Sequence, residues 1–279
     1  MDERVGTMNH TYMFEHEAMK TTYTLRLMAE NKTKAENAKR QCIECIDILE
    51  SKLSRHYEGG DIWLINRLNS GESLFISEDT YDCLLLALKA HELTAGLFDC
   101  TLGRQIEHRK SGAIGYTPPI KGRLRIDPDR PAVHCLEAGR EIDLGGIGKG
   151  YTLDRLRDIC LQWEIDSGLL SSGASTHLAY GKHKWPISLH SKQSSRIIPL
   201  VNEALSTSGA GTLNDDHIIS ADPKMLRTQQ ERIWLTTKNA VMADAWSTAA
   251  LLMNRDELNK ISGDQICVYI TEAEEIIQI

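Results

Sequence analysis

The chain has 279 residues, 41% of them hydrophobic, and a formal net charge of −7. This length and composition predict a globular chain of one large domain or two intimate halves, with a sizeable core. The acidic balance, with no basic block to offset it, argues against a general nucleic-acid binder. No apolar run reaches the roughly 18 residues that a membrane-spanning helix needs, so we expect a soluble chain without a transmembrane segment.

The cysteines bear on the cellular compartment. Seven are scattered through the chain, an odd number that predicts reduced thiols and a cytoplasmic location rather than a disulfide framework. Residues 2–7 are polar and do not resemble the apolar core of a signal peptide. A periplasmic or membrane-anchored form stays open, because removal of an N-terminal signal would leave the same pattern.

The first elements are a strand and a helix. Residues 20–29 alternate apolar and polar side chains, which predicts a half-buried strand in an antiparallel sheet. A capping-box pattern that starts at Thr33 predicts an amphipathic helix over 33–55. Cys42 and Cys45 lie on its apolar stripe. We interpret this pair as core packing, because no second pair or nearby histidine completes a metal or redox site.

Further along the chain the pattern changes. A second helix is predicted over 77–95, beginning at Ser77, with the apolar stripe Tyr81, Leu84, Leu85 and Leu88 and with Gly96 as its C-cap. Residues 104–140 contain four prolines and are predicted to be irregular. Strands are predicted later, around residues 185–189, 196–207 and 232–236.

A glycine-rich stretch, Glu141-Ile-Asp-Leu-Gly-Gly-Ile-Gly-Lys-Gly-Tyr-Thr-Leu-Asp154, separates these regions. A short strand is predicted around 142–144, and the apolar spacing from Leu153 onward predicts a helix over 150–163. The first turn of that helix opens on the glycines and on Lys149. Backbone N–H groups and the positive end of the helix dipole favour an anion there, whereas a tight turn that binds nothing is an equal alternative.

Two familiar phosphate motifs do not fit this stretch. A P-loop requires a serine or threonine after its lysine, but Gly150 and Tyr151 follow Lys149. A Rossmann fingerprint requires an acidic residue after the next strand, and the strand-like run 169–172 ends in serines.

The last predicted helix, over 243–254, carries a second candidate site. Asp244 and Thr248 are four residues apart and share one helical face. Both offer hard oxygen ligands suited to Mg²⁺ or Ca²⁺. The alternative is that Asp244 favours the helix dipole and Thr248 bonds back to the helix.

Six motifs in one order resemble the ApbE family, the FAD:protein FMN transferases. They are Ala18-Met-Lys-Thr21, Asp61-Ile-Trp-Leu-Ile-Asn66, Phe98-Asp-Cys-Thr-Leu-Gly103, Ile142-Asp-Leu-Gly-Gly-Ile-Gly-Lys-Gly-Tyr151, Thr207-Ser-Gly209 with His217-Ile-Ile219, and Ala243-Asp-Ala-Trp-Ser-Thr-Ala249. The resemblance implies an α+β fold related to the T-fold, in which antiparallel sheets pack with helices. It also implies a single ApbE-like domain over 1–279, whose two halves meet at a flavin cleft. The competing fold is a doubly wound parallel sheet.

The resemblance further implies transfer of FMN from FAD to a threonine of an acceptor flavoprotein, with Mg²⁺ and with release of AMP. It assigns Mg²⁺ to Asp244, Thr248 and a backbone carbonyl near Gly148, and a catalytic base to His217. The residues it implies for FAD binding are Met19, Asn66, Asp99, Thr101, Asp143, Gly146, Lys149 and Ser208.

The chain departs from the family pattern at several motifs. Lys20 stands where the family has glycine, and residues 171–175 read Ser-Ser-Gly-Ala-Ser where the family has Asn-x-Gly-Gly-Asp. The segment after Gly209 is shorter and lacks an aromatic residue, and the stretch after His217 lacks the family's Thr-Gly. Two other functions therefore stay open: a noncatalytic FAD-binding paralogue and a Mg²⁺-dependent FAD pyrophosphatase.

Overall fold

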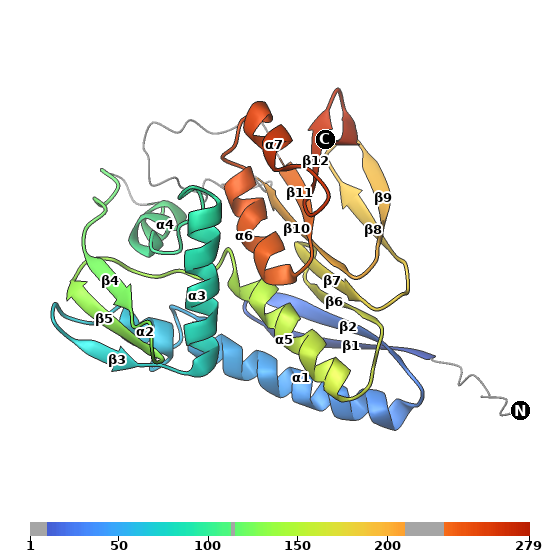
Figure 1. The fold of residues 1–279 in the computed structure, drawn as a ribbon, viewed down its shortest axis with the longest axis horizontal. Helices are drawn as coiled ribbons and strands as arrows, with labels where there is room; N and C mark the ends of the chain where they lie inside the picture. Colours follow the sequence, from blue (N-terminus) through green and yellow to red (C-terminus); the bar gives the residue numbers. More distant parts are fainter. Residues whose placement is uncertain (1–9, 113–114, 210–231) are drawn as a thin grey trace, which may run out of the picture.

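The computed structural model describes residues 10–112, 115–209 and 232–279. Its main feature is an eight-stranded sheet in the order β1-β2-β6-β7-β10-β11-β12-β13, in which every neighbouring pair is antiparallel (Figure 1). The strands are β1 (His10–Ala18), β2 (Thr21–Ala29), β6 (Gly168–Ser172), β7 (Thr176–Tyr180), β10 (Glu203–Gly209), β11 (Arg232–Thr237), β12 (Cys267–Glu272) and β13 (Glu275–Gln278). The α+β prediction is confirmed, and the parallel-sheet alternative is wrong.

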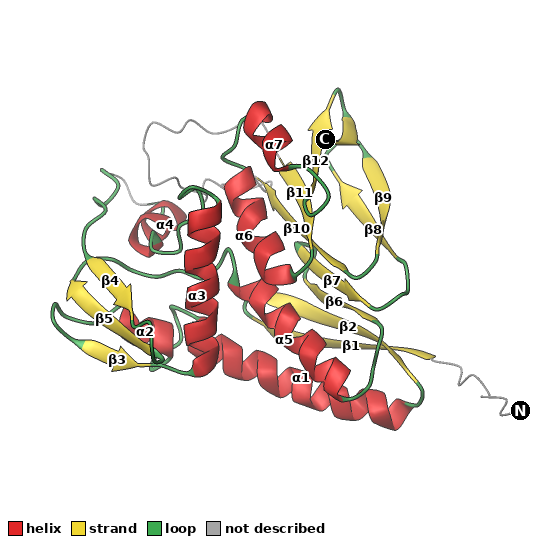
Figure 2. Cartoon of the chain, viewed as in Figure 1, coloured by secondary structure: helices red, strands yellow, loops and turns green. Residues whose placement is uncertain are grey.

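Helices form a layer along one side of this sheet, as Figure 2 shows. They are α1 (Lys32–Leu53), α3 (Glu78–Leu93), α5 (Gly148–Gln162), α6 (Ala240–Ala250) and α7 (Arg255–Ile261). On the other face, Leu169 and Ala179 of the sheet pack with Trp185 and Leu200 of a two-stranded hairpin. That hairpin is β8 (Trp185–His190) and β9 (Ser195–Leu200). The sheet is therefore covered on both faces, which explains why its central strands are almost wholly buried.

Burial along β2 follows the predicted alternation. Leu25, Leu27 and Ala29 are buried and Arg26 is exposed. Each buried side chain points toward α1, because successive residues of a strand face opposite sides of the sheet. Cys42 of α1 belongs to the same core, so the interpretation of the cysteine pair as packing is confirmed.

The helix boundaries correct two local predictions. The N-cap of α1 is Asn31, whose side chain accepts a hydrogen bond from the backbone N–H of Lys34, so the capping box at Thr33 is wrong. In α3, Ser77 caps the helix as expected, but Leu85 and Leu88 are exposed. The buried face is shifted toward smaller side chains, namely Thr80, Cys83, Leu84, Ala87 and Ala90. Small residues there allow α3 to pack closely on its neighbours.

The described part of 104–140, the region predicted to be irregular, contains regular elements. It contains α4 (Gly103–Lys110), β4 (Arg123–Ile126) and β5 (Ala132–Glu137). With β3 (Ser73–Phe75) the two strands form a small antiparallel sheet in the order β3-β5-β4, beside α2 (Asp61–Ile65). The four prolines lie in the connections between these elements, where they interrupt no hydrogen-bond ladder.

Nothing in the described ranges is a helix long and apolar enough to cross a membrane.

Candidate active site at the glycine-rich loop

A parallel β-bridge and the side chain of an asparagine hold the segment that leads into the glycine-rich loop. Residues 142–144 do not form the predicted strand; Glu141 alone makes a single β-bridge with Leu102. The side chain of Asn66 accepts a hydrogen bond from the backbone N–H of Ile142 at 2.7 Å and donates one to its carbonyl at 2.9 Å. The loop conformation therefore depends on residues distant in sequence.

The helix that follows the loop crosses α6 at very short range. A Cβ added at Gly150 would lie 2.2 Å from the carbonyl oxygen of Ala240, so only glycine fits at this crossing. Asp154 of α5 accepts hydrogen bonds from the backbone N–H groups of Ala240 and Val241, and thereby caps α6 from a neighbouring helix. Burial raises the pKa of Asp154, although these donors oppose the shift. The crossing fixes which residues of α6 face the loop.

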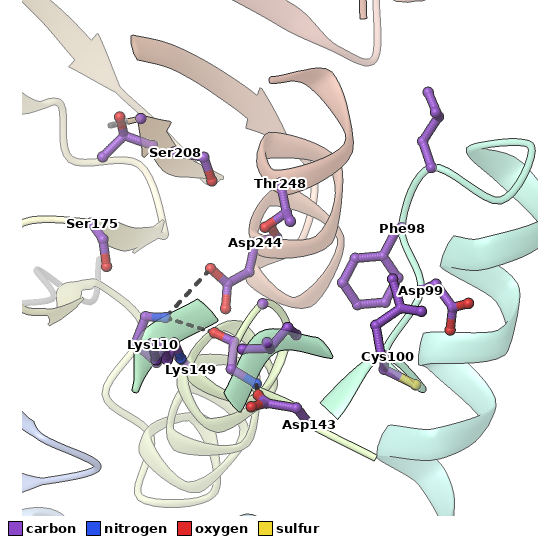
Figure 3. A pocket seen from close by; sticks show the side chains of 17 residues that line it. Phe98, Asp99, Cys100, Lys110, Asp143, Lys149, Ser175, Ser208, Asp244 and Thr248 are labelled. Carbon is purple, nitrogen blue, oxygen red and sulfur yellow. Dashed lines mark hydrogen bonds and ion pairs between the residues drawn. The ribbon is translucent and has the colours of Figure 1, made fainter. Parts of the chain in front are cut away.

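One residue that faces the loop is Asp244. Its side chain is almost fully buried, and its Oδ2 accepts a hydrogen bond from the backbone N–H of Gly150 at 3.1 Å. Its Oδ1 accepts hydrogen bonds from the hydroxyls of Thr176 and Ser206 at 3.2 and 3.3 Å. The Nζ of Lys149 lies 3.9 Å from the same Oδ1 and donates to the carbonyl of Gly145 (Figure 3). Hydrogen bonds from α5, β7 and β10 thus hold this carboxylate beside the glycine-rich loop.

A second carboxylate lies on the opposite side of the loop. The Oδ1 of Asp143 accepts a hydrogen bond from the backbone N–H of Gly145 at 2.8 Å. Its Oδ2 is 3.5 Å from Nη1 of Arg55, a largely buried guanidinium. Arg55 also bonds the side chain of Glu141 at 2.6 Å and the carbonyl of Gly103 at 2.5 Å. This arginine ties the end of α1 to both segments that approach the loop.

The two sides enclose a cavity of about 370 Å³, within the range of small-molecule sites. Figure 3 shows α6 and the start of α5 on one side and the segment that carries Phe98 on the other. The residues that line it are Leu97, Phe98, Asp99, Cys100, Leu102, Ile106, Lys110, Asp143, Gly145, Gly146, Lys149, Ser175, Thr207, Ser208, Gly209, Asp244 and Thr248.

Family membership follows from a comparison of the whole sequence. The sequence model of the ApbE family matches residues 19–269. The chain belongs to the ApbE family. A Klebsiella pneumoniae protein named FAD:protein FMN transferase is 23% identical over 181 residues, which cover 61% of this chain and 56% of that protein. The match thus spans little more than half the length of this relative.

Solved ApbE structures share the fold. The flavin transferase ApbE of Vibrio cholerae is similar with a TM-score of 0.79 and 17% identity, covering 97% of each chain. The flavinyl transferase ApbE of Pseudomonas stutzeri is similar with a TM-score of 0.80 and 18% identity, covering 100% of this chain and 96% of that one.

Seven of the residues implied by the ApbE resemblance line the cavity: Asp99, Asp143, Gly146, Lys149, Ser208, Asp244 and Thr248. Gly146 belongs there for a steric reason. A Cβ at this position would lie 3.1 Å from the Thr248 hydroxyl and 3.2 Å from the Phe98 ring. His217 lies outside the described residues.

The other four residues lie behind the cavity lining rather than in it. The backbone N–H of Met19 donates to Glu50, and Asn66 holds the loop backbone as described above. The Thr101 hydroxyl donates to the Asp99 carboxylate at 2.6 Å, and the carbonyl of Gly148 accepts a hydrogen bond from Thr152 at 2.8 Å. Thr101 thus contacts the cavity residue Asp99, and Asn66 contacts the backbone of Ile142 beside Asp143, whereas Met19 contacts Glu50, which does not line the cavity.

Sequence reasoning missed several cavity residues. Ile106 and Lys110 lie on α4, in the region predicted to be irregular, so the spacing that places both on one helical face had no helix to support it. Cys100 was seen only as part of a motif. Burial, followed by the charge of Asp99, raises the pKa of the Cys100 thiol to about 12. The raised pKa disfavours the thiolate, which is the nucleophilic form of cysteine.

Two of the departures from the family pattern, Lys20 and residues 171–175, lie at neighbouring turns. Met19 and Lys20 both have positive φ, 50° and 59°, as the central residues of the β1–β2 hairpin turn. The backbone N–H of Gly173, in the β6–β7 turn, donates to the carbonyl of Thr22 at 2.9 Å. Lys20 is exposed and does not line the cavity, whereas Ser175 does. The family glycine at this position is thus explained by turn geometry, not by close approach to a ligand.

Proposed function

We propose that this chain transfers FMN from FAD to a threonine of an acceptor flavoprotein and releases AMP. Membership of the ApbE family and the name of the Klebsiella relative support this reaction. The observation that carries the proposal is the arrangement around Lys149, which places a cation and the glycine-rich helix N-terminus beside the Asp244 carboxylate in one cavity. The lysine and the helix N-terminus favour a pyrophosphate, and the carboxylate favours a divalent cation.

The glycine-rich loop would bind the pyrophosphate of FAD. The backbone N–H of Gly146 donates to no described residue, and Gly146 lines the cavity next to the start of α5. The positive end of the helix dipole and the ammonium of Lys149 both favour an anion at this place. The apolar side chains of Leu97, Phe98 and Ile106 on the facing wall offer a surface for an aromatic ring of the substrate.

The donor set near Asp244 fits Mg²⁺ in one particular way. No group of three or more His, Cys, Asp or Glu side chains in the described ranges is placed to hold a metal by itself. Mg²⁺, however, is commonly held by one or two carboxylates together with substrate phosphates and water. Asp244 and Thr248 are hard oxygen donors of this kind, so they would hold the ion only once FAD is present. The carbonyl of Gly148 already accepts a hydrogen bond from Thr152, and Gly148 does not line the cavity. A bound Mg²⁺ would polarise the phosphoryl oxygens and stabilise their developing charge.

The reaction itself is a displacement at phosphorus. The acceptor hydroxyl attacks the phosphorus of the FMN moiety, a new P–O bond forms, and the phosphoanhydride bond to AMP breaks. The loop N–H groups and Lys149 would bind the charge that develops on the phosphoryl oxygens. The threonine proton must go to a base, and we propose His217 for this role because it matches the family's histidine.

The experiment that tests the proposal is incubation with FAD, Mg²⁺ and a flavoprotein domain that carries an acceptor threonine, followed by mass spectrometry of protein and nucleotide. Covalent FMN on the acceptor together with AMP supports transfer. Free FMN with AMP shows a pyrophosphatase instead, and unchanged bound FAD shows a noncatalytic binding protein.

A further inference from the structure

Positive charge is concentrated next to the cavity in an otherwise acidic chain. Residues 103–140 contain eight Lys or Arg and four Asp or Glu, whereas the whole chain has a net charge of −7. Charge of one sign gathered on one face steers a partner of the opposite sign toward it. The location of these cations therefore bears on how a protein acceptor reaches the site.

Contacts between three segments gather the cations on one surface. Arg104 of α4 donates to the carbonyl of Gly139 at 3.4 Å, and Gly139 lies against Lys121. Arg123 and Arg125 follow on the edge strand β4, two residues apart and both exposed, and the register of the β4–β5 ladder shifts between Arg123 and Leu124. We define Arg104, Lys121, Arg123 and Arg125 as the basic patch.

Helix α4 connects the basic patch to the active-site cavity. One of its faces, with Leu102, Ile106 and Lys110, lines that cavity. The opposite face lines a second cavity of about 590 Å³. This second cavity is lined by Arg55, His56, Asn66, Arg67, Arg104, Glu107, His108, Ser111, Pro118 and Glu141. A single short helix therefore separates the substrate cavity from a cavity rich in arginine and histidine.

Acidic groups lie close to two residues of the basic patch, Arg104 and Arg123. Glu141 is already bound by Arg55 at 2.6 Å and lies 3.7 Å from Arg104. Glu137 is paired in register with Arg123 across the β4–β5 ladder, and Glu107 lies on α4. Within the described part of the chain, Lys121, Arg123 and Arg125 form no ion pair, so their charges are directed to solvent.

We propose that the basic patch and the second cavity dock an acidic segment of the acceptor protein and hold its threonine at the active-site cavity across α4. This inference rests on the proposed transfer function. A protein partner fits better than nucleic acid, because Glu107 and Glu137 interrupt the patch and the net negative charge of the chain opposes a phosphate backbone. An acidic peptide offers separate carboxylates, each of which an arginine can bind in a bidentate manner.

The first test measures binding without any need for transfer. A fluorescein-labelled oligoglutamate peptide is titrated with the protein, and its anisotropy is followed at low and at physiological salt. The double charge reversal Arg123→Glu/Arg125→Glu is expected to weaken binding by at least about tenfold at low salt. The matched control is Lys182→Glu/Lys184→Glu, which makes the same charge change in the exposed turn before β8, on the far side of the molecule in Figure 1. The control is expected to bind like the wild type.

The second test uses the transfer reaction with an acidic flavoprotein domain as acceptor. We expect Arg123→Glu/Arg125→Glu to raise the KM for the acceptor about tenfold while the Kd for FAD stays unchanged. If the wild type transfers FMN and this variant has an unaltered acceptor KM, the docking inference is wrong although the function stands. If the wild type transfers nothing, the function fails, and peptide binding alone then tests the patch. Equal weakening by both double variants, or tighter binding of single-stranded DNA or of phosphatidylglycerol vesicles than of the peptide, would also overturn the inference.

Discussion

The two walls of the active-site cavity hold their carboxylates by different means. On the α5–α6 wall, Asp244 is held by neutral donors, namely two hydroxyls and one backbone N–H, and its nearest cation is Lys149 at 3.9 Å. On the facing wall, Asp143 lies 3.5 Å from Arg55, and Asp99 lies 3.8 Å from Arg140. Asp143 thus has an arginine at hydrogen-bond distance, whereas Asp244 and Asp99 each have a cation nearly 4 Å away.

This difference sets Asp244 apart from Asp143. Neutral donors orient Asp244 and leave its charge available at the cavity, which is what a metal ligand requires. The arginine that contacts Asp143 compensates its charge and ties the end of α1 to the loop, whereas Asp99 accepts hydrogen bonds from the backbone N–H and the hydroxyl of Thr101. Three aspartates lining one cavity are therefore expected to respond differently to mutation.

Asp244→Asn gives the largest expected effect, because it removes the charge and keeps the shape. We expect loss of Mg²⁺ dependence and a fall in transfer rate of about 10³-fold or more. The amide oxygen still accepts hydrogen bonds, so the variant is expected to fold. Mg²⁺ titrations of the rate and thermal melts of both forms test this. If the variant bound Mg²⁺ as tightly as the wild type, Asp244 would not be a metal ligand.

Arg55→Met is expected to destabilise the protein at the facing wall of the cavity. Asp143 and Glu141 would lose the guanidinium that compensates them, and the free energy of unfolding is expected to fall by about 3 kcal/mol. Arg104→Met is a matched control, because Arg104 contacts the same Glu141 but is half exposed, and its loss is expected to cost less than about 1 kcal/mol. Urea unfolding measures both values. If the two variants lost equal stability, burial of Arg55 would not increase its contribution to the free energy of unfolding.

A pH dependence of stability is expected from the strand behind the Asp244 wall. His177 follows Thr176 on β7, so it faces the opposite side of the sheet, and its Nδ1 lies 2.9 Å from the Ser171 hydroxyl. Burial lowers the pKa of His177 to about 4, against about 6.5 in an unfolded chain. Between these values the unfolded state binds more protons, so stability is fully present above pH 6.5 and decreases as the pH falls toward 4, by at most about 3 kcal/mol.

The check is urea unfolding at a series of pH values for the wild type and His177→Gln. The variant cannot titrate at this position, so its stability curve should be flatter over that interval. Parallel curves would assign the acid sensitivity to other groups.

Lys20→Gly gives the smallest expected effect, because Lys20 lies on neither wall. Its φ of 59° costs a side-chain-bearing residue about 1 kcal/mol that glycine avoids, although glycine adds entropy to the unfolded chain. We expect a stability change within about 1 kcal/mol and an unchanged Kd for FAD. Thermal melts and FAD titrations of both forms measure this. Tighter FAD binding by the variant would show that the lysine side chain reaches the substrate.

Much of the fold was predictable because local patterns carry it. The alternation along β2 and the helical spacing in α1 appear in the structure, since burial of one face leaves a period in the sequence. The region 104–140 was not predictable, because its strands are short and β5 pairs with β3, about sixty residues earlier in the case of Ser73 and His134. Such strands leave too little periodicity to be recognised, and the prolines between them obscure what remains.

The sequence by itself indicated seven of the residues that line the cavity. The spacing of Asp244 and Thr248 on one helix and the glycines before α5 are local features, and seven of the residues that the motifs implied line one cavity. Only the tertiary structure decided their roles. It placed Arg55 against Asp143, left Asp244 among neutral donors, and brought α4 with Lys110 to the cavity. Charge compensation depends on distances between segments that are far apart in the chain, and those distances are set by packing rather than by spacing along the sequence.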